Sequence, residues 1–106
     1  MARKKISGVV KKHVQKYLAS LDFPIEQAFI FGSQAKGRPR KYSDIDVAII
    51  SSKIRNSLAS TKYLLRKAHD LHSANFYIEP HGFHPREFVD ESPLAWEIKK
   101  TGVRLQ

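Results

Sequence analysis

Apolar residues near the start of the chain recur at helical spacing, at Ile6, Val10, Val14, Tyr17 and Leu21. Lys11, Lys12 and Lys16 fall on the opposite side, so the pattern predicts an amphipathic helix. We expect this helix to end before Phe23 and Pro24, because the residue preceding a proline disfavours the helical conformation.

Shorter apolar runs predict strands. Residues 28–31 form a continuous apolar run that Gly32 stops, which is typical of a buried strand. Residues 44–51 alternate, with Ile45, Val47 and Ile49 on one side and Asp46 on the other. A third strand is predicted over residues 75–81, and residues 103–105 suit a short edge strand.

Two further helices follow from the pattern. Residues 56–72 predict a long helix whose apolar face comprises Leu58, Thr61, Leu64, Leu65, Ala68, Leu71 and His72. A last helix opens with Ser92 as its cap and Pro93 at its first position, and it closes at Gly102. Leu94 and Ile98 are expected to face inward on it.

The order of these elements predicts an α/β (α+β) fold, a small mixed β-sheet of roughly three to five strands with helices packed on it. Residues 1–106 are expected to form a single domain, with residues 1–5 as a basic arm. We expect the acidic residues of the second strand to lie on an exposed face of the sheet, opposite the face that the helices cover.

The charge balance narrows the choice of partner. Nineteen Lys and Arg residues against ten Asp and Glu residues leave a formal charge of +9, which favours an anionic partner such as a nucleotide, a nucleic acid or an acidic protein. The chain contains no cysteine, which excludes disulfides and thiolate chemistry. No apolar run suits a membrane span or a signal core, so we expect a cytoplasmic location without membrane attachment.

Two carboxylates stand close together in the second predicted strand. Asp44 and Asp46 are two residues apart, so both point to one face at a separation of about 6.6 Å along the strand. Like charges so placed are reasonable when a cation lies between them, and oxygen ligands without cysteine suit Mg²⁺. The alternative is structural, with Asp44 capping a turn and Asp46 solvated.

Gly32 and Ser33 directly follow the first predicted strand. A glycine there lets the backbone approach a ligand closely, and the serine hydroxyl can donate to phosphate oxygens. The next residues are a basic loop, with Lys36, Arg38, Arg40 and Lys41, that is suited either to a phosphate or partner contact or simply to solvent.

These residues together resemble a known family. G-S-Q-A-K-G at residues 32–37, followed by S-D-I-D-V at residues 43–47, is similar to the signature of the DNA polymerase β-like nucleotidyltransferases. At this length the chain resembles their minimal prokaryotic members, which are commonly encoded beside a HEPN-domain protein. The resemblance extends over nearly the whole chain, with Glu79 matching a third acid on a later strand. It therefore implies the palm-like fold of these enzymes.

The resemblance also implies a reaction. Two Mg²⁺ ions would be held by Asp44, Asp46 and Glu79, and these three acids would also be the catalytic residues. The nucleotide would be bound by Gly32, Ser33, Lys36, Gly37 and Ser43. ATP would supply AMP to a hydroxyl of the HEPN partner, a toxin that this antitoxin would modify within a hetero-oligomer. The chemistry is consistent, because such transfer depends mainly on positioning and charge neutralisation.

Three positions depart from the family pattern. Gln34 and Lys36 stand where arginine is frequent, and Glu79 stands where aspartate is frequent. These departures leave open a weakly active or inactive module that neutralises its partner by binding. The charge of +9 leaves open an RNA-binding or RNA-modifying module, whose affinity would fall steeply with salt. A small-molecule acceptor is disfavoured by the lack of a second domain.

Two pairs of histidines and one tryptophan are further candidates for a functional role. His69 and His72, and again His81 and His84, have the spacing of a metal pair, but the sequence supplies no further zinc ligands. We expect packing or surface roles for the first pair. His81 and His84 follow Glu79 and flank the expected acceptor side. Trp96 points away from the inward stripe of its helix, which suits either an interface residue or local packing under a loop.

Overall fold

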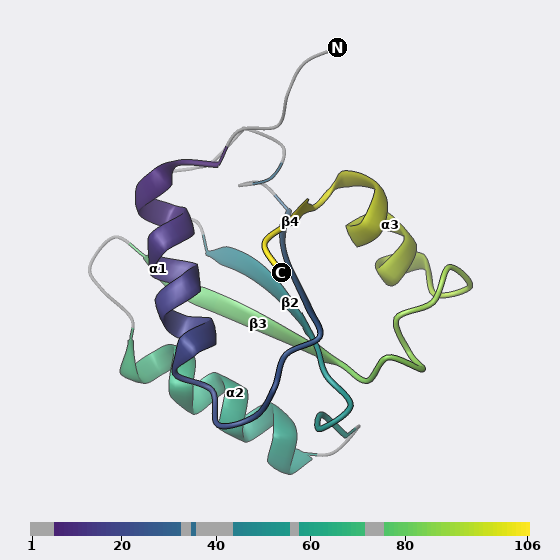
Figure 1. Ribbon diagram of the computed structural model, residues 1–106, viewed down its shortest axis with the longest axis horizontal. Coiled ribbons are helices and arrows are strands. Elements are labelled where there is room, and N and C mark those ends of the chain that lie inside the picture. The colour runs from purple at the N-terminus through teal and green to yellow at the C-terminus, as the bar shows by residue number, and fades with distance from the viewer. Residues whose placement is uncertain (1–5, 33–34, 36–43, 56–57, 72–75) are drawn as a thin grey trace.

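The computed structural model describes residues 6–32, 35, 44–55, 58–71 and 76–106 (Figure 1). In chain order its elements are α1 (Gly8–Ala19), β1 (Gln27–Phe31), β2 (Ile45–Ile50), α2 (Leu58–Asp70), β3 (Ile78–Phe83), α3 (Pro93–Thr101) and β4 (Val103–Arg104). The predicted order of helices and strands is confirmed, including the short strand after the last helix.

The four strands of the described residues form one mixed sheet in the order β3-β2-β1-β4. β1 pairs antiparallel with both β2 and β4, whereas β2 and β3 run parallel. Parallel neighbours need a crossover rather than a tight hairpin, and α2 provides it. The predicted α+β fold with a small mixed sheet is therefore correct.

One face of the sheet carries the larger core. Ile45, Val47 and Ile49 of β2 are all fully buried there beneath α1 and α2. The Tyr17 hydroxyl of α1 donates a hydrogen bond of 2.9 Å to the carbonyl oxygen of Leu64 in α2. Burial raises the pKa of Tyr17 well above its usual value, so the hydroxyl stays protonated and joins the two helices.

The opposite face carries a smaller core under α3. Ala48 and Ile50 pack there with Phe29, and with Ala95 and Ile98 from the helix. The acidic residues of β2 were expected on a face without helices. That prediction is correct only at the Asp46 end of the face, because α3 covers the end formed by Ala48 and Ile50.

The ends of two elements differ from the predictions. α1 begins at Gly8, since the Ser7 hydroxyl accepts a hydrogen bond from the backbone N–H of Val9 and acts as the cap. β3 spans Ile78–Phe83 rather than residues 75–81. β3 can include Pro80 and Gly82 because it lies at the sheet edge, where proline is tolerated, and because glycine suits a close approach. A Cβ at Gly82 would lie 2.8 Å from Leu64 Cδ1, so the glycine lets α2 pack closely on β3.

The apolar faces of the two later helices are narrower than predicted. In α2, Leu64 and Ala68 are buried, but Leu58 is 69% exposed and Leu65 also faces outward. His72 lies outside the described residues. In α3, Ala95 replaces the exposed Leu94 as the inward partner of Ile98, because the helix contacts the sheet at i, i+3 spacing. Trp96 is exposed, as predicted.

In the part of the chain that the structure describes, every helix is too short or too polar to span a bilayer.

Candidate active site

Asp46 owes its position to the alternation of β2. Its neighbours Ile45 and Val47 point into the larger core, so the Asp46 side chain must project from the opposite face. It pairs in register with Phe31 of β1 on one side and with Glu79 of β3 on the other. Its side chain is 26% exposed, which leaves a carboxylate that is accessible yet held within the sheet.

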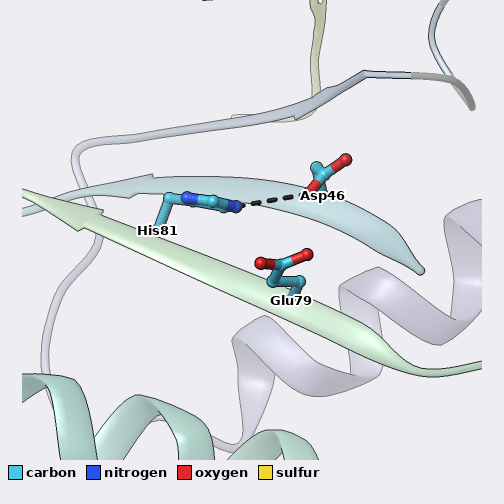
Figure 2. Close-up of side chains that lie close together, drawn as sticks. All are labelled: Asp46, Glu79 and His81. Atoms are coloured by element: carbon cyan, nitrogen blue, oxygen red, sulfur yellow. Dashed lines mark hydrogen bonds and ion pairs between the residues drawn. The ribbon is translucent and has the colours of Figure 1, made fainter. Parts of the chain in front are cut away.

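Glu79 and His81 come from the same face of β3. Because β2 and β3 are parallel and Glu79 pairs with Asp46, alternation places Glu79 and then His81 beside it. Figure 2 shows the three side chains projecting from one side of the two paired strands. Residues more than thirty positions apart in the chain thus meet at one point of the sheet.

His81 contacts Asp46 directly. Its Nε2 lies 3.2 Å from Asp46 Oδ1, and the two side chains are 30% and 26% exposed (Figure 2). The Phe31 ring packs edge-on against the imidazole, with centroids 5.0 Å apart. The ring of His81 is therefore held by an aromatic contact as well as by the carboxylate.

Gly32 directly follows β1 and lies beside Asp46. Its φ of +75° is a conformation that side chains rarely adopt, and a Cβ built there would overlap the Oδ2 of Asp46. The backbone can approach the carboxylate only because this residue is glycine. The sequence predicted that this glycine brings the backbone close to a ligand; in the described residues it brings the backbone close to the Asp46 side chain.

The other predicted site residues are distributed as follows. Asp44 immediately precedes β2 and is exposed, and it is not a member of the group that Asp46, Glu79 and His81 form. The predicted nucleotide-binding residues Ser33, Lys36, Gly37 and Ser43 lie outside the described residues, as do Gln34, Arg38, Arg40 and Lys41. The structure therefore describes only the acidic half of the predicted site together with its first glycine.

The donor set suits a divalent metal ion. One ligand atom from each of Asp46, Glu79 and His81 can be chosen so that all three lie within 4.8 Å of one another. Two carboxylates supply hard oxygen donors, and the imidazole supplies a nitrogen. The backbone of Gly32 lies directly beside the Asp46 carboxylate of this group. The residues present thus fit a divalent metal ion, with His81 as the third member in place of the predicted Asp44.

The contact between His81 and Asp46 was not anticipated from the sequence. The available signal was the two-residue spacing from Glu79 to His81, which places both on one face of a strand. The strand predicted over residues 75–81 includes both residues, but the sequence does not specify its register with β2. His84 lies beyond β3, and its Nδ1 accepts a hydrogen bond of 3.1 Å from the Arg86 backbone N–H. His81 and His84 therefore do not act as a pair.

The family of the chain follows from this fold and site together with one comparison. The family model described as polymerase beta, nucleotidyltransferase, matches residues 12–105. The chain therefore belongs to the polymerase β nucleotidyltransferase family, as the motif around Gly32 and Asp46 predicted.

Comparison with solved structures agrees on the fold. The chain is similar to a candidate nucleotidyltransferase from Sulfolobus solfataricus, with a TM-score of 0.54 and 22% sequence identity. The match covers 89% of this chain and 73% of the other. No curated protein matches the sequence.

Proposed function

We propose that this chain is a Mg²⁺-dependent nucleotidyltransferase that transfers AMP from ATP to a hydroxyl group of a partner protein. The observation that carries the proposal is the in-register pair Asp46 and Glu79, with Gly32 packed over the Asp46 carboxylate. Family membership supports the class of reaction. The identity of the nucleotide and of the acceptor rests on the resemblance of the sequence.

Asp46 and Glu79 would hold the metal, joined by Asp44 from the residue before β2. The bound metal would supply positive charge to the phosphate oxygens. In the reaction, the acceptor hydroxyl oxygen forms a bond to the α-phosphorus, the bond to the bridging α–β oxygen breaks, and pyrophosphate leaves. Glu79 is exposed and can accept the proton that the hydroxyl loses.

The nucleotide would lie beside the turn that Gly32 begins. Gly32 lies at the end of β1 in a left-handed conformation, with its backbone next to the Asp46 carboxylate. We assign phosphate contacts there to Ser33, Lys36, Gly37 and Ser43, on the strength of the motif.

The acceptor would approach from the open edge of the sheet. β3 is an edge strand and Glu79 is exposed on it, so a macromolecular hydroxyl can reach this side without a second domain. A HEPN-domain protein is the acceptor that the resemblance favours, and the pair would act as a toxin and its antitoxin.

Label transfer tests the proposal. ATP carrying a radioactive α-phosphate is incubated with Mg²⁺, this chain and the protein encoded beside it, the proposed HEPN partner. We expect label on the partner, and its loss in an Asp44→Asn, Asp46→Asn double variant. Asp90→Asn is the matched control, since Asp90 pairs with Lys99 at 3.0 Å outside the metal group. Absence of label with the intact chain, under conditions where the two proteins form a complex, would contradict the proposal.

A second candidate is a binding module without turnover. It is favoured by the position of Asp44 outside the group and by the occupation of one Asp46 oxygen by His81. The same double variant distinguishes the two. If the variant still silences the partner, binding alone is the mechanism. If silencing is lost while the complex persists, the mechanism is nucleotidyl transfer.

A further inference from the structure

The third member of the metal group is an imidazole rather than a third carboxylate. His81 Nε2, the atom nearest Asp46, faces the same side of the sheet as Glu79 (Figure 2). We propose that His81 is a metal ligand, and that the ion held by Asp46, Glu79 and His81 is a first-row transition metal such as Mn²⁺, bound in preference to Mg²⁺. This inference deepens the proposed function, on which it rests for the use of a metal, and it replaces Mg²⁺ by a transition metal ion at this group.

The distances suit ligation. Metal ions bind such donors at about 2.1 Å, so two adjacent ligands lie about 3.0 Å apart around an octahedral ion and about 3.4 Å apart around a tetrahedral one. The separation of 3.2 Å between His81 Nε2 and Asp46 Oδ1 falls between these values. Asp46 and His81 therefore need little rearrangement to bind one ion, and a Glu79 oxygen lies within 4.8 Å of a ligand atom of each.

The imidazole is also held in place for this role. The Phe31 ring contacts it edge-on, so binding a metal does not require the side chain to be ordered first. Neutral imidazole with its proton on Nδ1 presents a lone pair at Nε2, the atom that faces the carboxylates.

The nitrogen donor sets the preference among ions. Mg²⁺ favours oxygen ligands and retains its waters, whereas imidazole binds first-row transition metals more readily. A site with two carboxylates and one imidazole therefore binds Mn²⁺ and the later ions more tightly than Mg²⁺. In a purely structural role, His81 would only donate a hydrogen bond to Asp46.

Pulsed EPR of the Mn²⁺-loaded full chain separates ligation from positioning, because the spin echo is modulated by a directly bound ¹⁴N nucleus. We expect ¹⁴N modulation in the wild type and its loss in His81→Gln. Glutamine retains an N–H donor for Asp46 but no imidazole nitrogen, so a positioning role alone would survive this change. His84→Gln is the matched control and should keep the modulation.

Binding isotherms give the second readout. His81→Gln should lower Mn²⁺ affinity by roughly tenfold, the scale of effects seen around metal ligands, with less than about a threefold change for Mg²⁺. His84→Gln should leave both unchanged. An equal loss for both ions, Mn²⁺ binding without ¹⁴N modulation, modulation that persists in His81→Gln, or no Mn²⁺ binding would each overturn the inference.

These results are independent of label transfer. If ¹⁴N modulation is present but no partner is labelled with any metal, the proposed function fails and the ligand assignment stands. If labelling proceeds with Mg²⁺ while Mn²⁺ shows no nitrogen ligand, the ligand assignment fails and the proposed function stands.

Discussion

The two faces of the sheet use alternate residues of the same strands for different purposes. On the face toward α1 and α2, β2 presents Ile45, Val47 and Ile49, all fully buried. On the other face it presents Asp46, Ala48 and Ile50, of which only the last two are buried, beneath α3. One strand thus supplies both a continuous core and an open carboxylate.

The difference shows how a small domain keeps a charged site without weakening its core. Asp46 is adjacent in sequence to two buried residues, but strand alternation separates the faces, so the charge does not enter the larger core. On the face that carries Asp46, α3 covers the other end, where Ala48 and Ile50 lie. Changes on the two faces should therefore have separable effects on stability and on transfer.

The largest effect on stability is expected from the face that packs against α1 and α2, which we call the closed face. Ile49→Ala removes a fully buried side chain beneath the helices, which should lower the free energy of unfolding by about 2–5 kcal/mol. Label transfer by the folded fraction should change little. Urea denaturation measures the first effect, and Leu58→Ala, at a 69% exposed position, should stay within about 0.5 kcal/mol of the wild type. A stable Ile49→Ala protein without transfer would contradict the separation of the faces.

The complementary change is Asp46→Asn, on the opposite face of the sheet, which we call the open face. It should reduce label transfer by roughly a hundredfold or more, because charge at the reacting phosphate is no longer compensated. The free energy of unfolding should change by less than about 1 kcal/mol, since asparagine has the same shape at a partly exposed site. Equal losses in transfer and in stability would show that the two faces are coupled.

Local patterns in the sequence were sufficient for the order of elements and for the positions of Asp46 and Gly32 in the fold. Alternation in β2 placed Asp46 opposite the core residues, and the glycine after β1 marked the turn at Gly32. Both inferences depend only on neighbouring residues. The buried run of β1 and the cap at Ser92 are of the same kind, and both were correct.

Features that depend on distant partners were predicted less well. The Asp46–His81 contact requires the register between β2 and β3, which no local pattern specifies. The exposure of Leu58 and Leu65 depends on how little of α2 the sheet can cover. The continuation of β3 through Pro80 to Phe83 depends on its place at the sheet edge, where proline is compatible with pairing.

Gly32 is linked to both faces of the sheet, because it follows the buried strand β1 and its backbone packs on the Asp46 carboxylate. Gly32→Ala should lower the free energy of unfolding by about 1–3 kcal/mol, because alanine is strained at φ of +75° and its Cβ overlaps Asp46. Thermal unfolding measures this, and transfer should fall with it. Gly8→Ala is the matched control, because nothing lies within 4 Å of its Cβ position.

A double variant separates the two causes at Gly32. Asp46→Ala removes the overlapped carboxylate, so Gly32→Ala should be less destabilising in that background than in the wild type. Additive effects would mean that only the backbone conformation matters.

A smaller effect is expected at Tyr17, inside the closed face. Tyr17→Phe leaves the Leu64 carbonyl oxygen without the buried hydroxyl, which should lower the free energy of unfolding by about 1 kcal/mol. Because burial raises the pKa of Tyr17 above its ordinary 10.0, its contribution is present below pH 10.0 and is lost as the pH rises above it. Chemical denaturation across this range should show alkaline destabilisation that Tyr17→Phe reduces. Unchanged alkaline behaviour in the variant would assign it to another group.

The smallest effect is expected at His13, on the helix that covers the closed face. Its Nε2 is buried and lacks a hydrogen-bond partner among the described residues, and its ring lies 5.3 Å from that of Phe76. Burial, and secondly the charge of Lys16, lower the pKa of His13 below its ordinary 6.5. The unfolded chain then binds the proton more readily, so stability is fully present above pH 6.5 and falls as the pH drops below it.

Substitutions at two positions test this dependence. His13→Phe retains the aromatic contact and removes the titrating group, so the difference in urea midpoint between about pH 7.5 and about pH 5.5 should shrink. Lys16→Gln should shrink it less, because burial is the larger cause. If His13→Phe keeps the full difference, the acid sensitivity arises elsewhere. If Lys16→Gln removes all of it, charge rather than burial controls His13, and the closed face is less protected from water than its packing indicates.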